Sequence, residues 1–130
     1  MERLVFLIDS NVFLEALLEQ EKSNKAYLFI KEHKPYELFI SDFALHSIGI
    51  ILFKLNEQDL FKTFLANVIY NKIKVLSTNE RELEQVTQCA KEFSLDFDDA
   101  YQYTITKQYN LKLVSFDKDF DKTDLKRIEP

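Results

Sequence analysis

Short apolar segments recur along the chain at intervals, and they limit its fold more than any other feature. Residues 3–8 run into the apolar stretch VFLI without polar alternation, and LKLVSF (111–116) has the same buried character. Two further segments, YELFIS (36–41) and KIKVLS (72–77), also have the character of strands, and LKRIEP (125–130) is a candidate for a short last strand. Apolar strands without alternation are typical of a parallel sheet that is covered on both faces.

Segments with the apolar spacing of helices separate these strands. One glycine and two prolines leave few places for sharp turns, which indicates long helices joined by short polar loops. We expect one helix to run to about Glu19, with Ser10 or Asn11 as its N-cap. A second helix should follow it and end at about His33. Further helices are expected over 42–55, 59–70, 79–93 and 95–110. The alternation predicts an α/β fold, a three-layer α/β/α sandwich around a central, mostly parallel sheet of four or five strands.

Size and composition favour a single domain over residues 1–130. With 46% hydrophobic residues, the chain has ample material for one core. A lone cysteine, Cys89, cannot form an internal disulfide, and this is typical of a reducing compartment. No secretion signal opens the chain, and no apolar run approaches the roughly 20 residues that span a bilayer. We therefore expect a cytoplasmic protein with no membrane contact.

The net charge of −5 opposes general electrostatic attraction to nucleic acid, which clustered Lys and Arg would provide. A divalent metal bound among several acids would neutralise part of that charge. In that case the metal-bound protein is less negative than its formal charge, and it can still bind a substrate that contains phosphate.

Acidic residues stand where strands end. Asp9 directly ends the first apolar strand, Asp117 ends the fourth, and Asp99 lies in the first turn of the helix that leads into that fourth strand. Ligands bind at this edge of a parallel sheet, and ionised carboxylates that share a small volume need a counter-charge. We therefore expect Mg²⁺ or Mn²⁺, which prefer oxygen ligands, at this edge. The neighbouring Asp96 and Asp98 are interpreted as a helix cap and a solvated acid.

Four segments together resemble the PIN domain family, which includes the VapC-type toxins of bacterial toxin-antitoxin systems. They are LIDSNVFLEAL, LFISDFALHSIG, LDFDDAYQY and LKLVSFDKDFDK, and their order and spacing cover nearly the whole chain. The resemblance implies a ribonuclease that uses Mg²⁺ or Mn²⁺ to activate water for hydrolysis of RNA phosphodiester bonds. It implies that Asp9, Asp99 and Asp117 bind the metal and carry catalysis.

The resemblance also implies supporting residues around these acids. Asn11, two residues after the first acid, and Ser115, two residues before the last, correspond to polar residues that order the site and position the substrate. Asp119 is a weaker additional candidate for the acidic set.

One position departs from the family pattern. Family members usually carry Glu where this chain has Ser47, six residues after Ser41. Serine carries no charge and is a poor Mg²⁺ ligand, so metal affinity should fall, and Ser47 is left as a substrate-positioning candidate. Asp42 and His46 lie nearby and are candidates to replace the missing acid in part, although a helix cap and a partly buried histidine are their ordinary interpretations.

Two functions stay open at this point. The first is a metal-dependent ribonuclease, the toxin of a toxin-antitoxin pair, which cuts RNA in single-stranded or loop regions. The second is a weakened or inactive PIN-like scaffold that binds RNA or protein. The resemblance further implies an antitoxin protein over the acidic groove, and a homodimer formed through the apolar helices between residues 12 and 70.

Overall fold

The computed structural model describes residues 4–130, so Arg3, at the start of the predicted first strand, lies outside the described part. Four strands and six α-helices alternate along this part. The strands are β1 (Phe6–Ile8), β2 (Leu38–Ser41), β3 (Lys74–Leu76) and β4 (Lys112–Val114). The helices are α1 (Ser10–Leu17), α2 (Ser23–Glu32), α3 (Asp42–Lys54), α4 (Gln58–Tyr70), α5 (Glu80–Phe93), α6 (Phe97–Gln108) and a 3-10 helix, η1 (Lys118–Lys122). None of these helices is long and apolar enough to cross a membrane.

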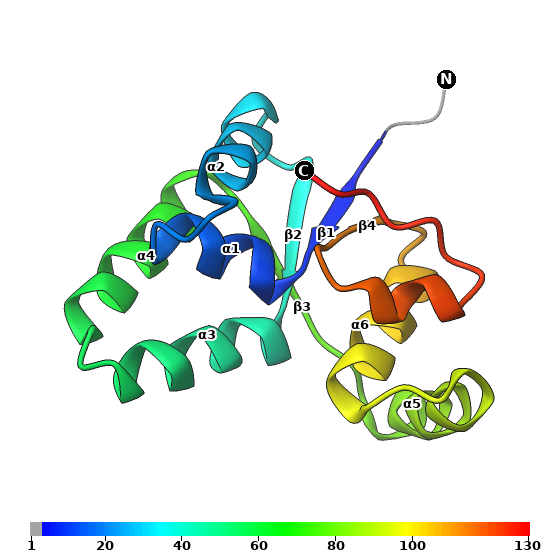
Figure 1. Ribbon diagram of the computed structural model, residues 1–130. Coiled ribbons are helices and arrows are strands. Elements are labelled where there is room, and N and C mark those ends of the chain that lie inside the picture. The colour runs from blue at the N-terminus through cyan, green and yellow to red at the C-terminus, as the bar shows by residue number, and fades with distance from the viewer. Residues whose placement is uncertain (1–3) are drawn as a thin grey trace.

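The four strands form one parallel sheet in the order β3-β2-β1-β4 (Figure 1). Strand β1 is central, where Leu7 pairs with Leu113 of β4. Strand β4 follows β1 at the edge of the sheet, so the two strands that end in acids are direct neighbours. The predicted last strand over 125–130 is reduced to a single parallel bridge between Val114 and Ile128.

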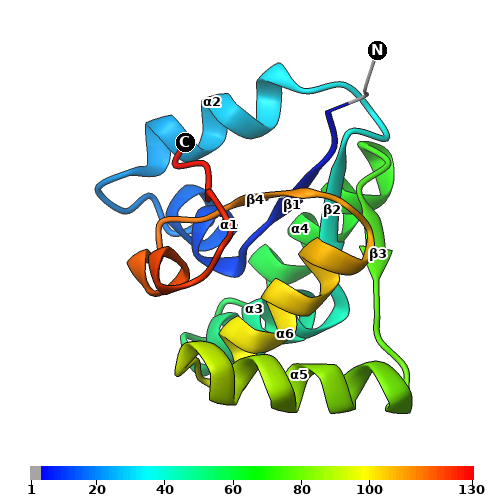
Figure 2. The ribbon, with the colours of Figure 1, turned by 90° about the vertical axis from the view of Figure 1, so that its right-hand side faces the viewer.

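The sheet is covered on both faces, which confirms the predicted three-layer α/β/α sandwich. Phe6 and Ile8 of β1 point to one face and pack in a core with α1, α2, α3 and α4. Leu7, between them, points to the other face and packs with α5, α6 and η1. Figures 1 and 2 show these two groups of helices on opposite sides of the strands. The unalternating apolar pattern of this strand thus reflects burial on both faces.

In two helices the N-cap lies one or two residues earlier than the sequence indicates, at the end of the preceding strand. The N-cap of α1 is Asp9, not Ser10 or Asn11, and its carboxylate accepts a hydrogen bond from the Ser10 N–H. The N-cap of α3 is Ser41 rather than Asp42. Both caps lie where a strand passes directly into a helix, so the strand's last polar residue is already positioned to accept from the first turn.

The ends of α5 and α6 follow the sequence-based expectations more closely. Asn79 caps α5 in a reciprocal arrangement, in which its side chain accepts from the Glu82 N–H and the Glu82 side chain accepts from the Asn79 N–H. Asp96 occupies the N-cap position of α6, but its side chain makes no capping hydrogen bond. Asn110, just beyond the end of α6, adopts the left-handed conformation (φ 53°) that terminates helices.

Gly49 interrupts the apolar pattern of α3 for a packing reason. A Cβ atom at this position would lie 2.9 Å from Cζ of Phe61 in α4, closer than side chains tolerate. The absence of a side chain therefore allows the Phe61 ring to pack against the α3 backbone, and it sets how closely α3 and α4 approach.

Candidate metal centre

A polar cavity of about 210 Å³ opens at the carboxyl ends of β1 and β4, between the first turns of α3 and α6. Its lining residues are Asp9, Ser10, Asn11, Phe43, Ala44, Ser47, Asp98, Asp99, Gln102 and Asp117. The cavity therefore collects side chains that are up to 108 positions apart in the sequence, from Asp9 to Asp117. Its place is the edge of the sheet at which the sequence predicts ligand binding.

Asp9 is buried in this cavity, with only 6% of its surface exposed. Its Oδ1 accepts hydrogen bonds from the Ser10 N–H (2.9 Å) and from Nε2 of Gln102 (3.0 Å). Its Oδ2 accepts from Oγ of Ser115 (2.7 Å) and from Nδ2 of Asn11 (3.3 Å). Burial raises the pKa of Asp9 above 3.8, and the hydrogen bonds from Ser115, Gln102 and Ser10 act in the opposite direction. These four donors explain how a carboxylate can end a buried strand.

Asn11 and Ser115 connect Asp9 to the loop that follows β4. Asn11 also donates to Oγ of Ser115 (3.1 Å), and its own Oδ1 accepts from the Phe116 N–H (3.1 Å). The same Ser115 Oγ accepts from the Asp117 N–H (2.9 Å). The two side chains thus fix the backbone that carries Asp117. Direct contact of either one with a substrate stays a prediction.

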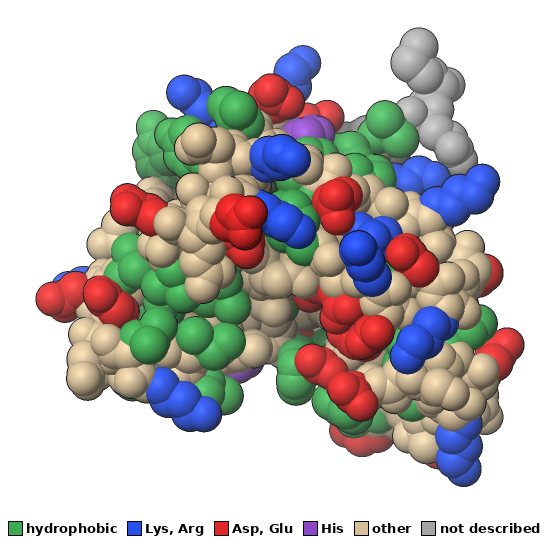
Figure 3. Space-filling view, in the orientation of Figure 1, with side chains coloured by type: hydrophobic (Ala, Val, Ile, Leu, Met, Phe, Trp, Pro, Cys, Tyr) green, Lys and Arg blue, Asp and Glu red, His purple; other side chains and the backbone are tan. Residues whose placement is uncertain are grey.

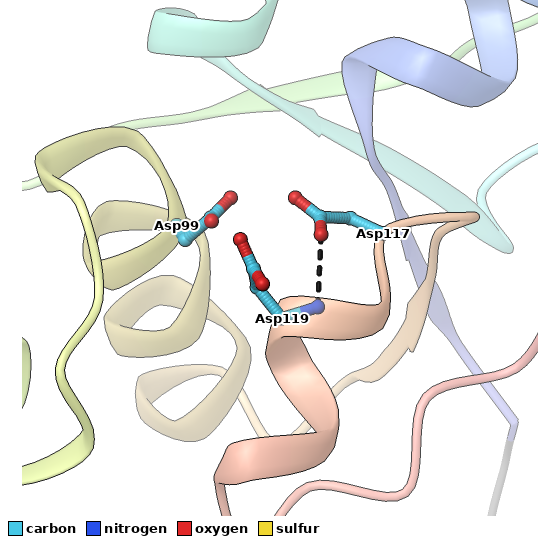
Figure 4. Close-up of side chains that lie close together, drawn as sticks. All are labelled: Asp99, Asp117 and Asp119. Carbon is cyan, nitrogen blue, oxygen red and sulfur yellow. Dashed lines mark hydrogen bonds between the residues drawn. The ribbon is translucent and has the colours of Figure 1, made fainter.

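Three carboxylates lie close together (Figure 4), and two of them, Asp99 and Asp117, line the cavity. Asp99 extends from α6 toward Asp117 and Asp119, which follow β4, and one ligand oxygen from each lies within 4.8 Å of the others. Oδ1 of Asp117 accepts a hydrogen bond from the Asp119 N–H at 2.9 Å. The predicted pair Asp99 and Asp117 is therefore brought together, with the weaker candidate Asp119 beside them. Asp9 lines the same cavity, and its role as a metal ligand stays a prediction.

The electrostatics of this cluster favour a bound cation. Burial, followed by the charges of Asp117, Asp98 and Asp9, raises the pKa of Asp99 from 3.8 to about 8. The acids therefore cannot all be ionised at neutral pH unless a positive charge joins them. Clustered carboxylate oxygens are the donors that Mg²⁺ and Mn²⁺ prefer, so these residues fit such an ion.

Ser47 of α3 lines the cavity, whereas the two residues considered as replacements for the missing acid do not. Oδ1 of Asp42 accepts hydrogen bonds from the Tyr101 hydroxyl (2.6 Å) and the Phe43 N–H (2.8 Å), so this carboxylate is already engaged. The ring of His46 is exposed rather than partly buried, and its Nδ1 contacts the backbone oxygen of Asp42. The structure therefore gives no support to compensation by Asp42 or His46.

Gln102 belongs to the site although the sequence-based interpretation missed it. It lies one helical turn after Asp99, is 2% exposed, and donates to Asp9. Its Oε1 is buried without a hydrogen-bond partner within residues 4–130. The sequence does contain one indication of this role. Gln102 is a polar residue three positions after Asp99, so both side chains lie on the same face of the predicted helix.

Comparison with protein families shows the family to which this chain belongs. Residues 6–126 match the family model of the PIN domain. The chain belongs to the PIN domain family. This confirms the resemblance drawn from the four sequence segments. PIN domains generally depend on a divalent metal, and the cluster of Asp99, Asp117 and Asp119 is an acidic group of the kind that can hold one.

Solved structures share the fold at low sequence identity. VapC20 of Mycobacterium tuberculosis, described as a sarcin-ricin loop cleaving toxin, has a TM-score of 0.81 with 14% identity, over 96% of this PIN domain protein and 99% of that chain. PAE2754 of Pyrobaculum aerophilum has a TM-score of 0.71 with 23% identity, over 97% and 89%. VapBC2 of Rickettsia felis, bound to a DNA fragment from its promoter, has a TM-score of 0.72 with 10% identity, over 97% and 98%. No curated protein matches the sequence.

Proposed function

We propose that this PIN domain protein is a metal-dependent ribonuclease that hydrolyses RNA phosphodiester bonds. The observation that carries the proposal is the convergence of Asp99, Asp117 and Asp119, of which the first two line the same cavity as Asp9. A Mg²⁺ or Mn²⁺ ion held by these carboxylates would lower the pKa of a bound water and polarise the phosphate.

The protein's own side chains have distinct roles in this proposal. Asp99 and Asp117 supply metal ligands, Asp119 adds a third, and Asp9 supplies buried negative charge and is a further candidate ligand. Asn11 and Ser115 hold Asp9 and the backbone of Asp117 in register through the hydrogen bonds that link β1 to β4. A site so fixed needs little reorganisation when the ion and the phosphate bind.

The proposal is tested by Mn²⁺-dependent cleavage of a mixed RNA pool. Asp9→Asn, Asp99→Asn and Asp117→Asn should each lose cleavage, because each substitution removes one negative charge from the site. Glu84→Gln, which changes an exposed acid on α5, is the matched control and should cleave like the parent. If the folded parent cleaves no better than Asp117→Asn, the nuclease function is rejected.

Ser47 favours a second candidate function, a PIN-like scaffold that binds RNA or protein with weakened or absent cleavage. Its neutral hydroxyl faces the cavity where the family usually has Glu, so one charge is missing from the site. Ser47→Glu separates the two functions. Under the ribonuclease proposal, the variant binds Mn²⁺ more tightly and cleaves faster than a parent that is already active. Under the scaffold proposal, cleavage appears only in the variant.

The printed descriptions of structural neighbours support a toxin-antitoxin role. One neighbour is a toxin-antitoxin complex from Klebsiella pneumoniae, with a TM-score of 0.70 and 16% identity over 88% of each chain. By analogy, we propose that this protein is the toxin of such a pair, that it acts on cytoplasmic RNA as a single domain, and that a small antitoxin protein covers its acidic groove. The partner is tested by expressing this protein together with the small protein encoded by a neighbouring reading frame. The two should purify as one complex, and failure to purify together would reject this partner.

A further inference from the structure

Three aromatic rings form a cluster at the rim of the acidic cavity. Phe43 follows the first residue of α3 and lines the cavity, while Phe97 is the first residue of α6 and precedes Asp98 and Asp99. The ring centroids of Phe43 and Phe97 are 5.7 Å apart, and those of Phe43 and Tyr101 are 5.6 Å apart. The third pair, Phe97 and Tyr101, is separated by 5.9 Å. The cluster therefore joins the two helix starts that flank the acids.

One ring of the cluster, Tyr101, is buried and hydrogen-bonded, whereas another, Phe97, is exposed to solvent. Tyr101 is 5% exposed, its hydroxyl donates to Oδ1 of Asp42 (2.6 Å), and it accepts from the Thr78 N–H (3.2 Å). Phe97, in contrast, is 54% exposed although it packs against the buried ring of Tyr101 and the half-buried ring of Phe43. A supported ring with an open surface can accept a flat ligand without rearrangement of the protein.

The exposed ring of Phe97 packs against Phe43 and directly precedes Asp98 in the chain, and these two neighbours line the acidic cavity although Phe97 does not. Figure 3 shows hydrophobic side chains next to acidic ones where the surface is hollowed between the starts of α3 and α6. Ile69, another large exposed side chain, belongs to α4, which does not line the acidic cavity. Ile50 and Phe53 are on α3, but they lie beyond Ser47, the last residue of that helix that lines the cavity. Position therefore distinguishes Phe97 from the ordinary exposed apolar residues of a protein surface.

We propose that Phe97, supported by Phe43 and Tyr101, is a stacking platform for an unpaired nucleobase beside the phosphate that the acidic site binds. This inference rests on the proposed ribonuclease function and names the substrate form that the site selects. Every base has an aromatic face, so the platform would accept an unpaired base of any sequence, whereas the bases of a duplex are already stacked and unavailable. A chain with net charge −5 has little general attraction for RNA, so stacking and the bound cation together supply the affinity.

Oligonucleotide binding tests the platform separately from cleavage. The probe is a short fluorescein-labelled single-stranded RNA in Ca²⁺, followed by anisotropy, together with versions that carry one abasic site at successive positions. The variants are Phe97→Leu, which keeps apolar bulk but loses the ring, and Phe97→Tyr, which keeps the ring. Tyr109→Leu, at the other end of α6, is the matched control. Thermal melting and Mn²⁺ titration show that each variant is folded and retains its metal site.

Phe97→Leu should bind the intact RNA at least about fivefold more weakly than the parent, the effect of losing one stacked base. An abasic site at one position should weaken binding to the parent by a similar factor and leave Phe97→Leu unaffected, while Phe97→Tyr and Tyr109→Leu behave like the parent. Equal binding of intact RNA by Phe97→Leu and the parent would overturn the platform and assign Phe97 to a protein contact, with the ribonuclease proposal intact. Absence of RNA binding by the parent would overturn both.

Discussion

A proton on Asp99 compensates for the crowding of acids in the metal-free site. Burial and the neighbouring carboxylates raise the pKa of this group from 3.8 to about 8, so the folded protein retains a proton that the unfolded chain has lost over most of that interval. Stability then falls as pH rises, because the unfolded state binds fewer protons than the native state. Asp9, whose pKa is also raised by burial, acts in the same direction.

The free energy of unfolding of the metal-free protein should therefore be lower at pH 8 than at pH 5, by at least about 1.4 kcal/mol, the equivalent of one pKa unit. Urea denaturation in EDTA at the two pH values measures the difference. Saturating Mn²⁺ should reverse much of it by replacing the proton, and Asp99→Asn should flatten the metal-free dependence. A metal-free parent that is equally stable at both pH values contradicts this account of Asp99.

Gln102 makes a second prediction about single side chains. Gln102→Leu removes the donor to Asp9 together with the unpartnered Oε1. It should therefore lower the free energy of unfolding by only about 1 kcal/mol. Gln102→Glu should cost more, about 2 kcal/mol or above at pH 8, because it buries a carboxylate against Asp9. Equilibrium urea denaturation compares the two, and a Glu variant as stable as the Leu variant would reject a direct contact with Asp9.

At this scale, the sequence predicts the residues that chain position alone places at the site. Asp9 directly follows β1, Asp117 lies three residues beyond β4, and Asp99 is in the first turn of the helix before β4, so parallel topology directs all three to the same edge of the sheet. Gln102 lacks such a marker, because its role depends on side-chain contact with a residue 93 positions away. The pairing of Asp119 with Asp117 likewise depends on the turn of η1, which apolar periodicity does not reveal.

Strand-to-helix junctions organise the elements around the cavity. Ser41 ends β2 and caps α3, where its buried Oγ accepts from the Ala44 N–H at 2.9 Å. Asn79 caps α5 at an exposed position. The sequence predicts the helices to within a few residues, but it overestimates the strands: segments of six residues contain strands of only three or four. Strand ends are decided by pairing with neighbours, which no single segment encodes.

The two caps should differ in their contribution to stability. Asn79→Ala should cost about 1 kcal/mol, the usual value for a cap that water can partly replace. Ser41→Ala should cost about 2 kcal/mol, because it leaves the Ala44 N–H buried without an acceptor. Urea denaturation of both variants measures the difference, with Ser77→Ala, outside any helix, as control. Equal costs would mean that solvent reaches the start of α3.

Across the whole molecule, the order β3-β2-β1-β4 does most to create the site. It places β4 directly beside β1, so the two strands that end in acids are neighbours although β4 is an edge strand. The sequence predicts the layers and the parallel direction, but it does not determine strand order, since the same alternation of strands and helices is compatible with several orders. The resemblance to the PIN family implied that Asp9, Asp99 and Asp117 share one site, but the order of the strands is known only from the structure.

The remaining prediction is the homodimer expected through the apolar helices between residues 12 and 70. Exposed apolar side chains narrow the proposed interface to α3 and α4. Five large apolar side chains are more than half exposed on α3, its C-cap and α4: Ile50, Phe53, Leu55, Ile69 and Tyr70. Exposed apolar surface of this kind is typical of protein interfaces. Light scattering after size exclusion should show the parent as a dimer and the pair Phe53→Lys and Ile69→Lys as a monomer, because desolvating two added charges opposes association. Tyr27→Lys on α2 should remain dimeric, and a monomeric parent at micromolar concentration would reject this interface.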